Sequence, residues 1–237
     1  MLRFDPILPI LILVLPILIL VAVCYSLRCG AQPTHSKDHL VTAEILFSKD
    51  VVTVAYRKAI EHTLYATPGE LARFIQLPGA TNPETVVSVY KVGGATPKYM
   101  VTCTQSSSSL WETVPRPGAP VRKNGSPMRV LRCDAEISAS LASSIHRIWL
   151  TMLTTVKPEA VRRGVVSIDG TSEIFTAVEG GNRELHGAAP NEYPKNGRVS
   201  DLISLAFLLQ AYCDPPPEGR DVVAAKLTQA VRKFPVN

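Results

Sequence analysis

A serine and a lysine three residues apart, Ser88 and Lys91, have the spacing with which one class of hydrolase places a nucleophile and its base on a single helical turn. The neighbouring residues are rich in Val and Tyr, which favours a strand. Positions three apart on a strand point to opposite faces, so the lysine could not readily activate the serine. The companion motifs of such enzymes are also missing. We do not expect this pair to be catalytic.

Two histidines four residues apart, His35 and His39, have a spacing that binds metal when both lie on one helical turn with further ligands. Here they flank a short polar linker, and no complete ligand set surrounds them. Phosphate-binding loops, zincin helices, nucleophile elbows, dinucleotide-binding glycines and internal repeats are all missing from the sequence. We therefore expect solvated histidines, no metal and no cofactor.

Beyond the N-terminal region the chain has three cysteines, Cys103, Cys133 and Cys213. This odd number allows one disulfide and one free thiol. Cys103 and Cys133 fall in predicted strands on either side of a long loop, so they are the expected pair if the domain is exported. The alternative is three buried free thiols.

Two groups of side chains are candidates for binding a partner. The first lies around the polar loop before a predicted buried helix, where a ligand could sit at the helix start; it comprises His186, Tyr193 and Arg198. The second is a run of cations without an acid between Pro115 and Arg132, comprising Arg116, Arg122, Lys123, Arg129 and Arg132. An ordinary polar connection and a solvated charged loop are the respective alternatives.

The cations of this loop could bind anionic lipid headgroups or an acidic protein. The chain as a whole has 25 basic and 20 acidic residues, a net charge of +5. This excess is too small to indicate nucleic acid, and we expect no nucleic-acid partner.

The longest uncharged stretch runs from Ile7 to Leu27 and consists mostly of Ile, Leu, Val and Pro. As a helix it would be roughly 31 Å long, about the thickness of a bilayer's hydrocarbon core. We therefore divide the chain into a signal-anchor or transmembrane segment (1–31), a linker (32–38) and one soluble domain (39–237). Cleavage after Ala31 would instead give a secreted form. Lipidation at Cys24 or Cys29 is a third interpretation.

The charges beside the apolar stretch do not decide its orientation, because Arg3 lies on one side and Arg28 and Lys37 on the other. A single N-terminal segment before one long domain usually accompanies export. We therefore expect a single-pass membrane protein whose C-terminal domain is extracytoplasmic, for example in the periplasm.

Within the domain, alternating apolar residues predict a strand at 41–47, and 52–64 fits either a strand or a helix. A capping pattern at 67–70 predicts a short helix over 67–77. Further strands are predicted at 86–92, 98–105 and 129–133, the first two as a hairpin.

The later part of the domain has the most periodic helix, at 138–156. Asp169-Gly170 predicts a tight hairpin between 165–168 and 171–178, with a third strand at 184–186. A buried helix at 202–212 and an amphipathic helix from 221 follow. Together these elements predict an α+β domain of antiparallel hairpins packed by helices.

The function that this pattern favours is a membrane-tethered, exported, non-enzymatic binding or envelope-accessory domain. A small exported hydrolase with dispersed catalytic residues is the alternative, so the question of enzymatic activity stays open. An enzyme should have a deep cleft where His, Cys, Asp or Glu side chains converge, whereas a binding module should have an apolar patch or a basic face.

Overall fold

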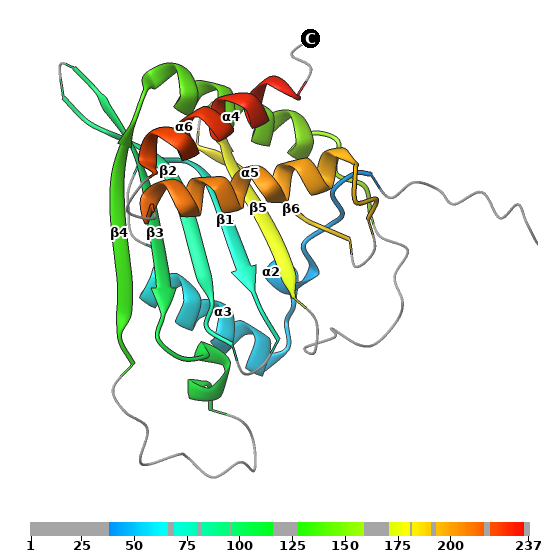
Figure 1. Ribbon diagram of the computed structural model, residues 1–237. Helices are drawn as coiled ribbons and strands as arrows, with labels where there is room; N and C mark the ends of the chain where they lie inside the picture. The colour runs from blue at the N-terminus through cyan, green and yellow to red at the C-terminus, as the bar shows by residue number, and fades with distance from the viewer. Residues whose placement is uncertain are drawn as a thin grey trace, which may run out of the picture. The chain divides into compact units, whose positions relative to one another are not determined.

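The sheet at the centre of the fold has six strands, each antiparallel to its neighbours, in the order β4-β3-β2-β1-β5-β6 (Figure 1). A computed structural model describes residues 38–65, 69–79, 82–94, 96–115, 128–158, 171–180, 182–190, 193–215 and 219–234. The strands are β1 (Glu70–Leu77), β2 (Thr85–Val92), β3 (Lys98–Ser106), β4 (Val130–Ile137), β5 (Ser172–Glu179) and β6 (Arg183–Ala188).

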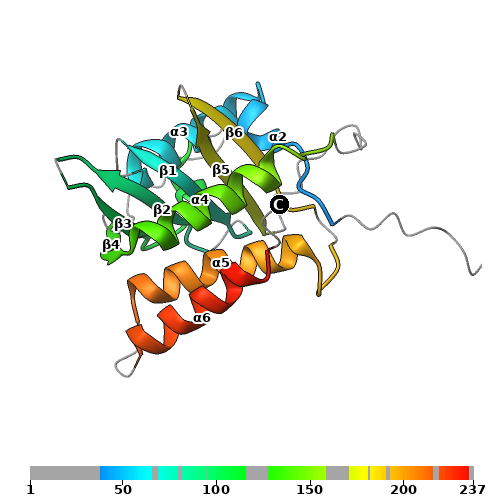
Figure 2. The same cartoon turned by 90° about the horizontal axis from the view of Figure 1, so that it is seen from above.

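One face of the sheet packs against α4 (Ala139–Leu153) and α5 (Arg198–Cys213), and α6 (Arg220–Arg232) packs mainly on α5. Figure 2 shows α5 and α6 on the side of the sheet opposite to α3. Phe74 and Phe175 are partners in neighbouring strands, with ring centroids 5.1 Å apart, and Trp149 of α4 packs on Phe175. This aromatic cluster is the centre of the larger core.

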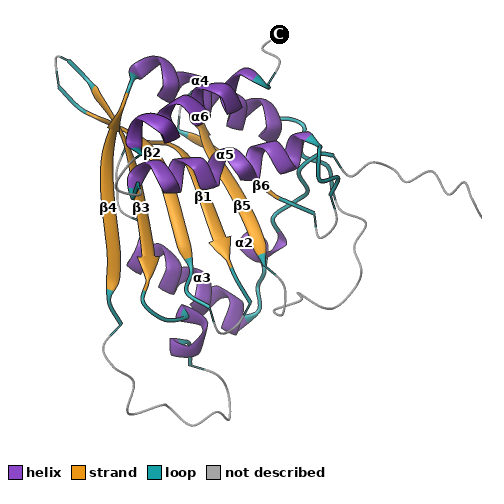
Figure 3. Ribbon diagram, in the orientation of Figure 1, coloured by secondary structure: helices purple, strands orange, loops and turns teal. Residues whose placement is uncertain are grey.

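The other face packs against α3 (Val51–Leu64), with the short helices α2 (Glu44–Phe47) and η1 (Leu110–Thr113) beside it (Figure 3). The helix α3 begins where the Asp50 carboxylate accepts a hydrogen bond from the Thr53 amide at 2.8 Å, which satisfies one of the unpaired donors of the first turn. Tyr56, Ile60 and Leu64 then recur at helical spacing and are buried.

A carboxylate with no exposed surface, that of Glu84, lies just before β2. It accepts five hydrogen bonds, from the hydroxyls of Tyr56 (2.7 Å), Ser106 (2.9 Å) and Ser109 (3.2 Å) and from the amides of Leu110 (2.8 Å) and Trp111 (3.3 Å). These donors satisfy the buried oxygens and join α3, β3 and η1.

The predicted α+β class is confirmed. The hairpin expected at 86–92 and 98–105 is β2–β3, and the helices expected at 138–156, 202–212 and from 221 are α4, α5 and α6. The strands expected at 129–133 and 184–186 belong to β4 and β6. The segment 52–64, which fitted either a strand or a helix, is helical.

The predicted helix over 67–77 is wrong, because residues 70–77 form β1. This strand has β2 on one side and β5 on the other, so both sets of its backbone groups are paired. The Glu70 side chain pairs with Arg73 and accepts a hydrogen bond from Ser88. Pairing with two neighbours outweighs the local capping signal.

Two further predictions agree with the structure only in part. In the expected strand at 41–47 only Val41 makes bridges, and Glu44–Phe47 is the helical turn α2. The strand expected at 171–178 is β5, which pairs with β1 and β6, while its expected hairpin partner at 165–168 lies outside the described residues. Asp169-Gly170 itself lies outside the described residues.

The apolar stretch from Ile7 to Leu27 and the expected linker up to Lys37 also lie outside the described residues. Among the helices that the structure does describe, none combines the length and the apolar character needed to cross a bilayer. Residues 37–237 cluster as one compact unit.

Candidate functional site

A row of polar and charged side chains crosses all six strands on the face that packs against α3. Each member is the register partner of the next, and each points to the same side of the sheet as its partner. The row runs from β4 to β6 through Asp134, Thr102, Ser88, Arg73, Thr176 and His186. Thr104 lies two residues after Thr102 on β3 and on the same face of the sheet. Its hydroxyl donates to the carbonyl of Leu64, the last residue of α3.

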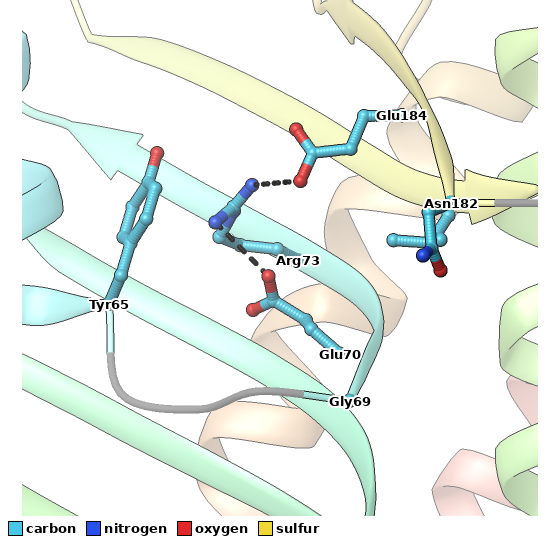
Figure 4. Close-up of a pocket in the computed structure, with 7 residues that line it drawn as sticks. Tyr65, Gly69, Glu70, Arg73, Asn182 and Glu184 are labelled. Atoms are coloured by element: carbon cyan, nitrogen blue, oxygen red, sulfur yellow. Dashed lines mark ion pairs between the residues drawn. The ribbon is translucent and has the colours of Figure 1, made fainter.

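Arg73 is the centre of this row, and its guanidinium is almost completely buried. Its Nη1 lies 3.0 Å from Oε2 of Glu70, and its Nη2 lies 3.8 Å from Oε1 of Glu184 (Figure 4). The Tyr65 ring covers the guanidinium, with 3.8 Å between the ring centroid and the central carbon. Its Nε is buried and has no hydrogen-bond partner within the described ranges.

An irregularity in β1 brings Glu70 to the same face as Arg73. The register with β2 shifts between Glu70 and Ala72, which is the signature of a β-bulge. Without the shift, residues three apart would point to opposite faces. The preceding Gly69 has φ +87°, and a Cβ there would lie 2.9 Å from the Lys91 carbonyl oxygen. A glycine is therefore required where the chain enters the site.

A cavity of about 340 Å³ opens beside this ion pair. Its lining comes from the end of α3, the start of β1 and the β5–β6 turn, and comprises Tyr65, Gly69, Glu70, Arg73, Val178, Asn182 and Glu184. Asn182 adopts φ 66° in that turn and contributes an amide side chain to the wall (Figure 4). Two carboxylates and one guanidinium line the cavity, so its lining has one excess negative charge when both acids are ionised.

Burial controls the ionisation of these groups. It raises the pKa of Glu70 above the usual carboxyl value, although Arg73 and the hydrogen bond from Ser88 act in the opposite direction. Burial likewise raises the pKa of Tyr65 to about 12, so this phenol is neutral near pH 7. Burial lowers the pKa of His186, which favours a neutral imidazole.

A series of hydrogen-bonding groups leads from the buried row to the cavity. The Thr176 hydroxyl lies 3.2 Å from Nδ1 of His186, and Nε2 of His186 lies 3.5 Å from Oε2 of Glu184. A hydroxyl, an imidazole and a carboxylate in this order are the components of a hydrolase triad. The Thr176 side chain belongs to a residue with only 2% of its surface exposed, so a substrate has no direct access to it.

None of the three loop candidates lines the cavity, but His186 of β6 lies 3.5 Å from Glu184, which does. Tyr193 is half-buried against the larger core, where burial raises the pKa of its phenol. Arg198 is the exposed first residue of α5.

The predicted basic loop is only partly described, because Arg116, Arg122 and Lys123 lie outside the described residues. Arg129 and Arg132 are exposed, as expected. Arg132 is not an unpaired cation, however: its Nε and Nη2 donate to the Asp134 carboxylate at 2.9 and 3.0 Å. Asp134 lies two residues after Arg132, the last cation of the basic run, and on the same face of β4.

The expected disulfide between Cys103 and Cys133 is replaced by a bond between Cys133 and Cys213, with the two α-carbons 5.9 Å apart. Cys103 and Cys133 are indeed register partners in β3 and β4, but the end of α5 brings a third sulfur to the same place. Cys103 is therefore a free thiol, and burial raises its pKa to about 11.

Sequence reasoning missed the groups that define the cavity, namely Tyr65, Glu70, Arg73, Asn182 and Glu184. One signal was present: Arg73 interrupts the otherwise apolar run from Leu71 to Ile75. A cation in such a run must be paired or exposed, and its partners come from elements that the sequence does not place beside it.

The described part of the chain contains no group of three or more His, Cys, Asp or Glu side chains placed to hold a metal ion. No known protein family, curated protein or solved structure matches the chain. The function must therefore be argued from the cavity itself.

Proposed function

We propose that this chain is a membrane-tethered, exported, non-enzymatic binding domain that takes a small cationic ligand, such as an amine, into the Arg73 cavity. The observation that carries the proposal is the acid excess of the lining, where Glu70 and Glu184 face a single cation, Arg73. A cationic ligand would be attracted by this excess of acid. The cavity volume of about 340 Å³ is at the lower end of the range typical for small-molecule sites.

Three side chains of the lining would contact such a ligand. Glu184, with 47% of its side-chain surface exposed, offers an accessible carboxylate at the rim. Glu70 lies deeper and is held in place by Arg73 and Ser88. The Asn182 amide can donate to or accept from a neutral part of the ligand. Burial raises the pKa of Glu70. A bound cation would act in the opposite direction and favour the ionised carboxylate.

Export is supported by two independent features. The uncharged stretch from Ile7 to Leu27 has the length of a membrane anchor. The disulfide between Cys133 and Cys213 is of a kind that persists in oxidising compartments. The cavity of the domain would then lie outside the cytoplasm.

The test is calorimetric titration of the full-length chain in detergent micelles with putrescine, 1,4-butanediol and succinate. These probes share a four-carbon frame and differ in charge. We expect binding of putrescine alone, and tighter binding as rising pH ionises Glu70. Binding of the diol as tightly as the diamine, or of succinate in preference to both, would show that the acid excess does not select the ligand.

A matched pair of variants locates the binding. Glu184→Gln should weaken putrescine binding about fivefold, because a partly exposed ion pair contributes on the order of 1 kcal/mol. Glu136→Gln changes an exposed glutamate of β4 that pairs with Lys98 at 3.1 Å, far from the cavity lining. It should bind as the parent does. Equal weakening in both variants would point to a non-specific charge effect.

The series Thr176, His186 and Glu184 is the specific observation that favours the alternative, a small exported hydrolase. In that case the Thr176 hydroxyl would pass its proton to His186 and attack the ester carbonyl. The bond to the leaving alcohol would break, the alcohol would take the proton from His186, and water would then hydrolyse the acyl-threonine to release the acid. Hydrolysis of p-nitrophenyl acetate by the parent, lost in Thr176→Val but kept in Ser88→Ala, would support this function. We expect no difference between the parent and Thr176→Val, because the hydroxyl is buried.

A second binding surface in this proposal is the basic loop, through which the domain would contact anionic headgroups or an acidic protein. Arg129 is exposed beside β4. Co-sedimentation of residues 38–237 with anionic liposomes should fall when Arg116, Arg122 and Lys123 are changed to Ser. It should also fall at high salt, as the screening length drops from about 10 Å at 0.1 M to about 3 Å at 1 M. Equal sedimentation of the parent and the variant would refute the membrane contact.

A further inference from the structure

The two edge strands of the sheet, β6 and β4, differ in whether another segment pairs with their outer side. At the β6 edge, Val41 pairs with Ala188, the last residue of β6: its amide donates to the Ala188 carbonyl at 2.9 Å and its carbonyl accepts from the Ala188 amide at 2.8 Å. At the other edge, the described residues place no strand beyond β4 (Figure 1). An open edge strand is a template for pairing with another strand.

The hydrogen-bond pattern shows which β4 residues face outward. Ser107 donates its amide to the Arg129 carbonyl, so the odd-numbered residues along β4 face β3. The even-numbered residues Val130, Arg132, Asp134 and Glu136 therefore direct their amides and carbonyls away from the sheet. The Glu136 carbonyl, which accepts from the Tyr212 hydroxyl at 3.0 Å, agrees with this assignment.

The side chains of β4 also resemble those of an interface more than those of a protected edge. Val130 and Leu131 are 41% and 60% exposed. The pairing with β3 is continuous over eight residues without a bulge, and the strand contains neither Pro nor Lys. Bulges, proline and charged side chains, lysine above all, are the usual means of blocking an edge. The charged side chains of β4 include both signs, so a second copy of the strand can pair with them.

We propose that β4 pairs with β4 of a second copy of this chain, antiparallel and about a twofold axis at Cys133. In this register Arg132 of one copy lies opposite Asp134 of the other, and the same pair recurs on the far side of the axis. Since Arg132 and Asp134 of one chain are already bonded, the four groups form a ring of alternating charge. Leu131 lies opposite the partner's Ala135 and is covered.

Charge and backbone geometry together select this register. Outward-facing residues must pair with outward-facing residues, so the strand can shift only in steps of two. One shift places Arg132 opposite the partner's Arg132. The opposite shift places Asp134 opposite the partner's Asp134 between two Arg132–Glu136 pairs, so of the three registers only that about Cys133 has no like charges directly opposite each other. Like charges directly opposite each other are destabilising, whereas opposite charges stabilise the pair. The strand is therefore complementary to itself in one register, as a twofold interface requires.

Oxidative cross-linking of the full-length chain in membranes tests the register directly. The native cysteines Cys24, Cys29 and Cys103 are first changed to Ser, while the disulfide between Cys133 and Cys213 is kept. Val130→Cys and Glu136→Cys are then introduced together, both at exposed positions. The two positions are too far apart within one strand to bond to each other, but across the axis their α-carbons should be about 5.5 Å apart, within disulfide range.

We expect the double-cysteine chain to form a covalent dimer that reductant reverses, and either single cysteine to give none. Adding Arg132→Pro should abolish the cross-link, because it removes an outward amide and the paired charge while leaving the bonds to β3. Absence of the dimer, with the chain folded by circular dichroism, overturns the proposal. Equal dimer from the single cysteines overturns it as well, since another interface would then hold the copies together. A third result that overturns it is a dimer unaffected by Arg132→Pro.

Discussion

Replacing Arg73 with Gln removes the cation that compensates a buried carboxylate. The side chains of Arg73 and Glu70 are 8% and 14% exposed, so neither charge is well solvated. Removing one partner of such a pair leaves the other charge buried and costs about 3–5 kcal/mol of unfolding free energy. We expect a loss of this size near pH 7, because the variant keeps the Glu70 carboxylate and the hydrogen bond from Ser88 but not the cation.

The pH dependence of this loss follows from the sign of the pKa shift. Burial raises the folded-state pKa of Glu70 above its unfolded value. Such a group contributes stability that is present at low pH and is lost as pH rises through the folded-state pKa. Removing Arg73 removes a cause that lowers this pKa, so the pKa rises further. The destabilisation by Arg73→Gln should thus be largest near neutral pH and should shrink when acid protonates Glu70.

Urea unfolding of residues 38–237 at several pH values measures both effects. The double variant Glu70→Gln with Arg73→Gln should be more stable than Arg73→Gln alone near pH 7, because it contains no uncompensated buried charge. Lys98→Gln, which breaks an exposed ion pair with Glu136, should change stability by less than about 1 kcal/mol. A cost of Arg73→Gln that is as small as that of Lys98→Gln, or that does not vary with pH, would refute the reasoning.

Three further expectations concern the folding of the domain. Glu84→Gln should destabilise it by about 2–4 kcal/mol in urea unfolding, because an amide donor would face the Leu110 amide and leave a buried donor unsatisfied; a loss below about 0.5 kcal/mol would contradict the five-donor network. Peptide mapping without reductant should find Cys133 joined to Cys213, and reduction should lower stability by roughly 4 kcal/mol for a sequence separation of 80 residues; any other pairing would refute it. Residues 38–237 expressed alone should melt cooperatively, because both cores lie within them; aggregation without a transition would argue against an independent domain.

Elements whose signal is local could be predicted from the sequence. The helix α4 has a regular apolar face, and the β2–β3 hairpin has strands rich in Val, Tyr and Thr on either side of Gly93-Gly94, so each pattern specifies its element without help from distant residues. The α+β class follows from their sum. His186 also emerged as a candidate, because a histidine in a polar region is visible in the sequence.

The candidate site itself could be recognised only in the tertiary structure. The local pattern before β1 favours a helix, and only pairing with both β2 and β5 makes it a strand and places Arg73 in the middle of a sheet. Glu184 is more than a hundred residues from Arg73 in the sequence, and Tyr65 reaches it from the end of a helix.

The disulfide depends in the same way on the position of α5 over β4, which brings Cys213 to Cys133. A sequence pattern reports which face of an element is apolar, but burial, ion pairing and disulfide formation depend on distances between elements. The sequence by itself therefore determined the class of fold and most of its elements, whereas packing between them decided which charges meet in the cavity.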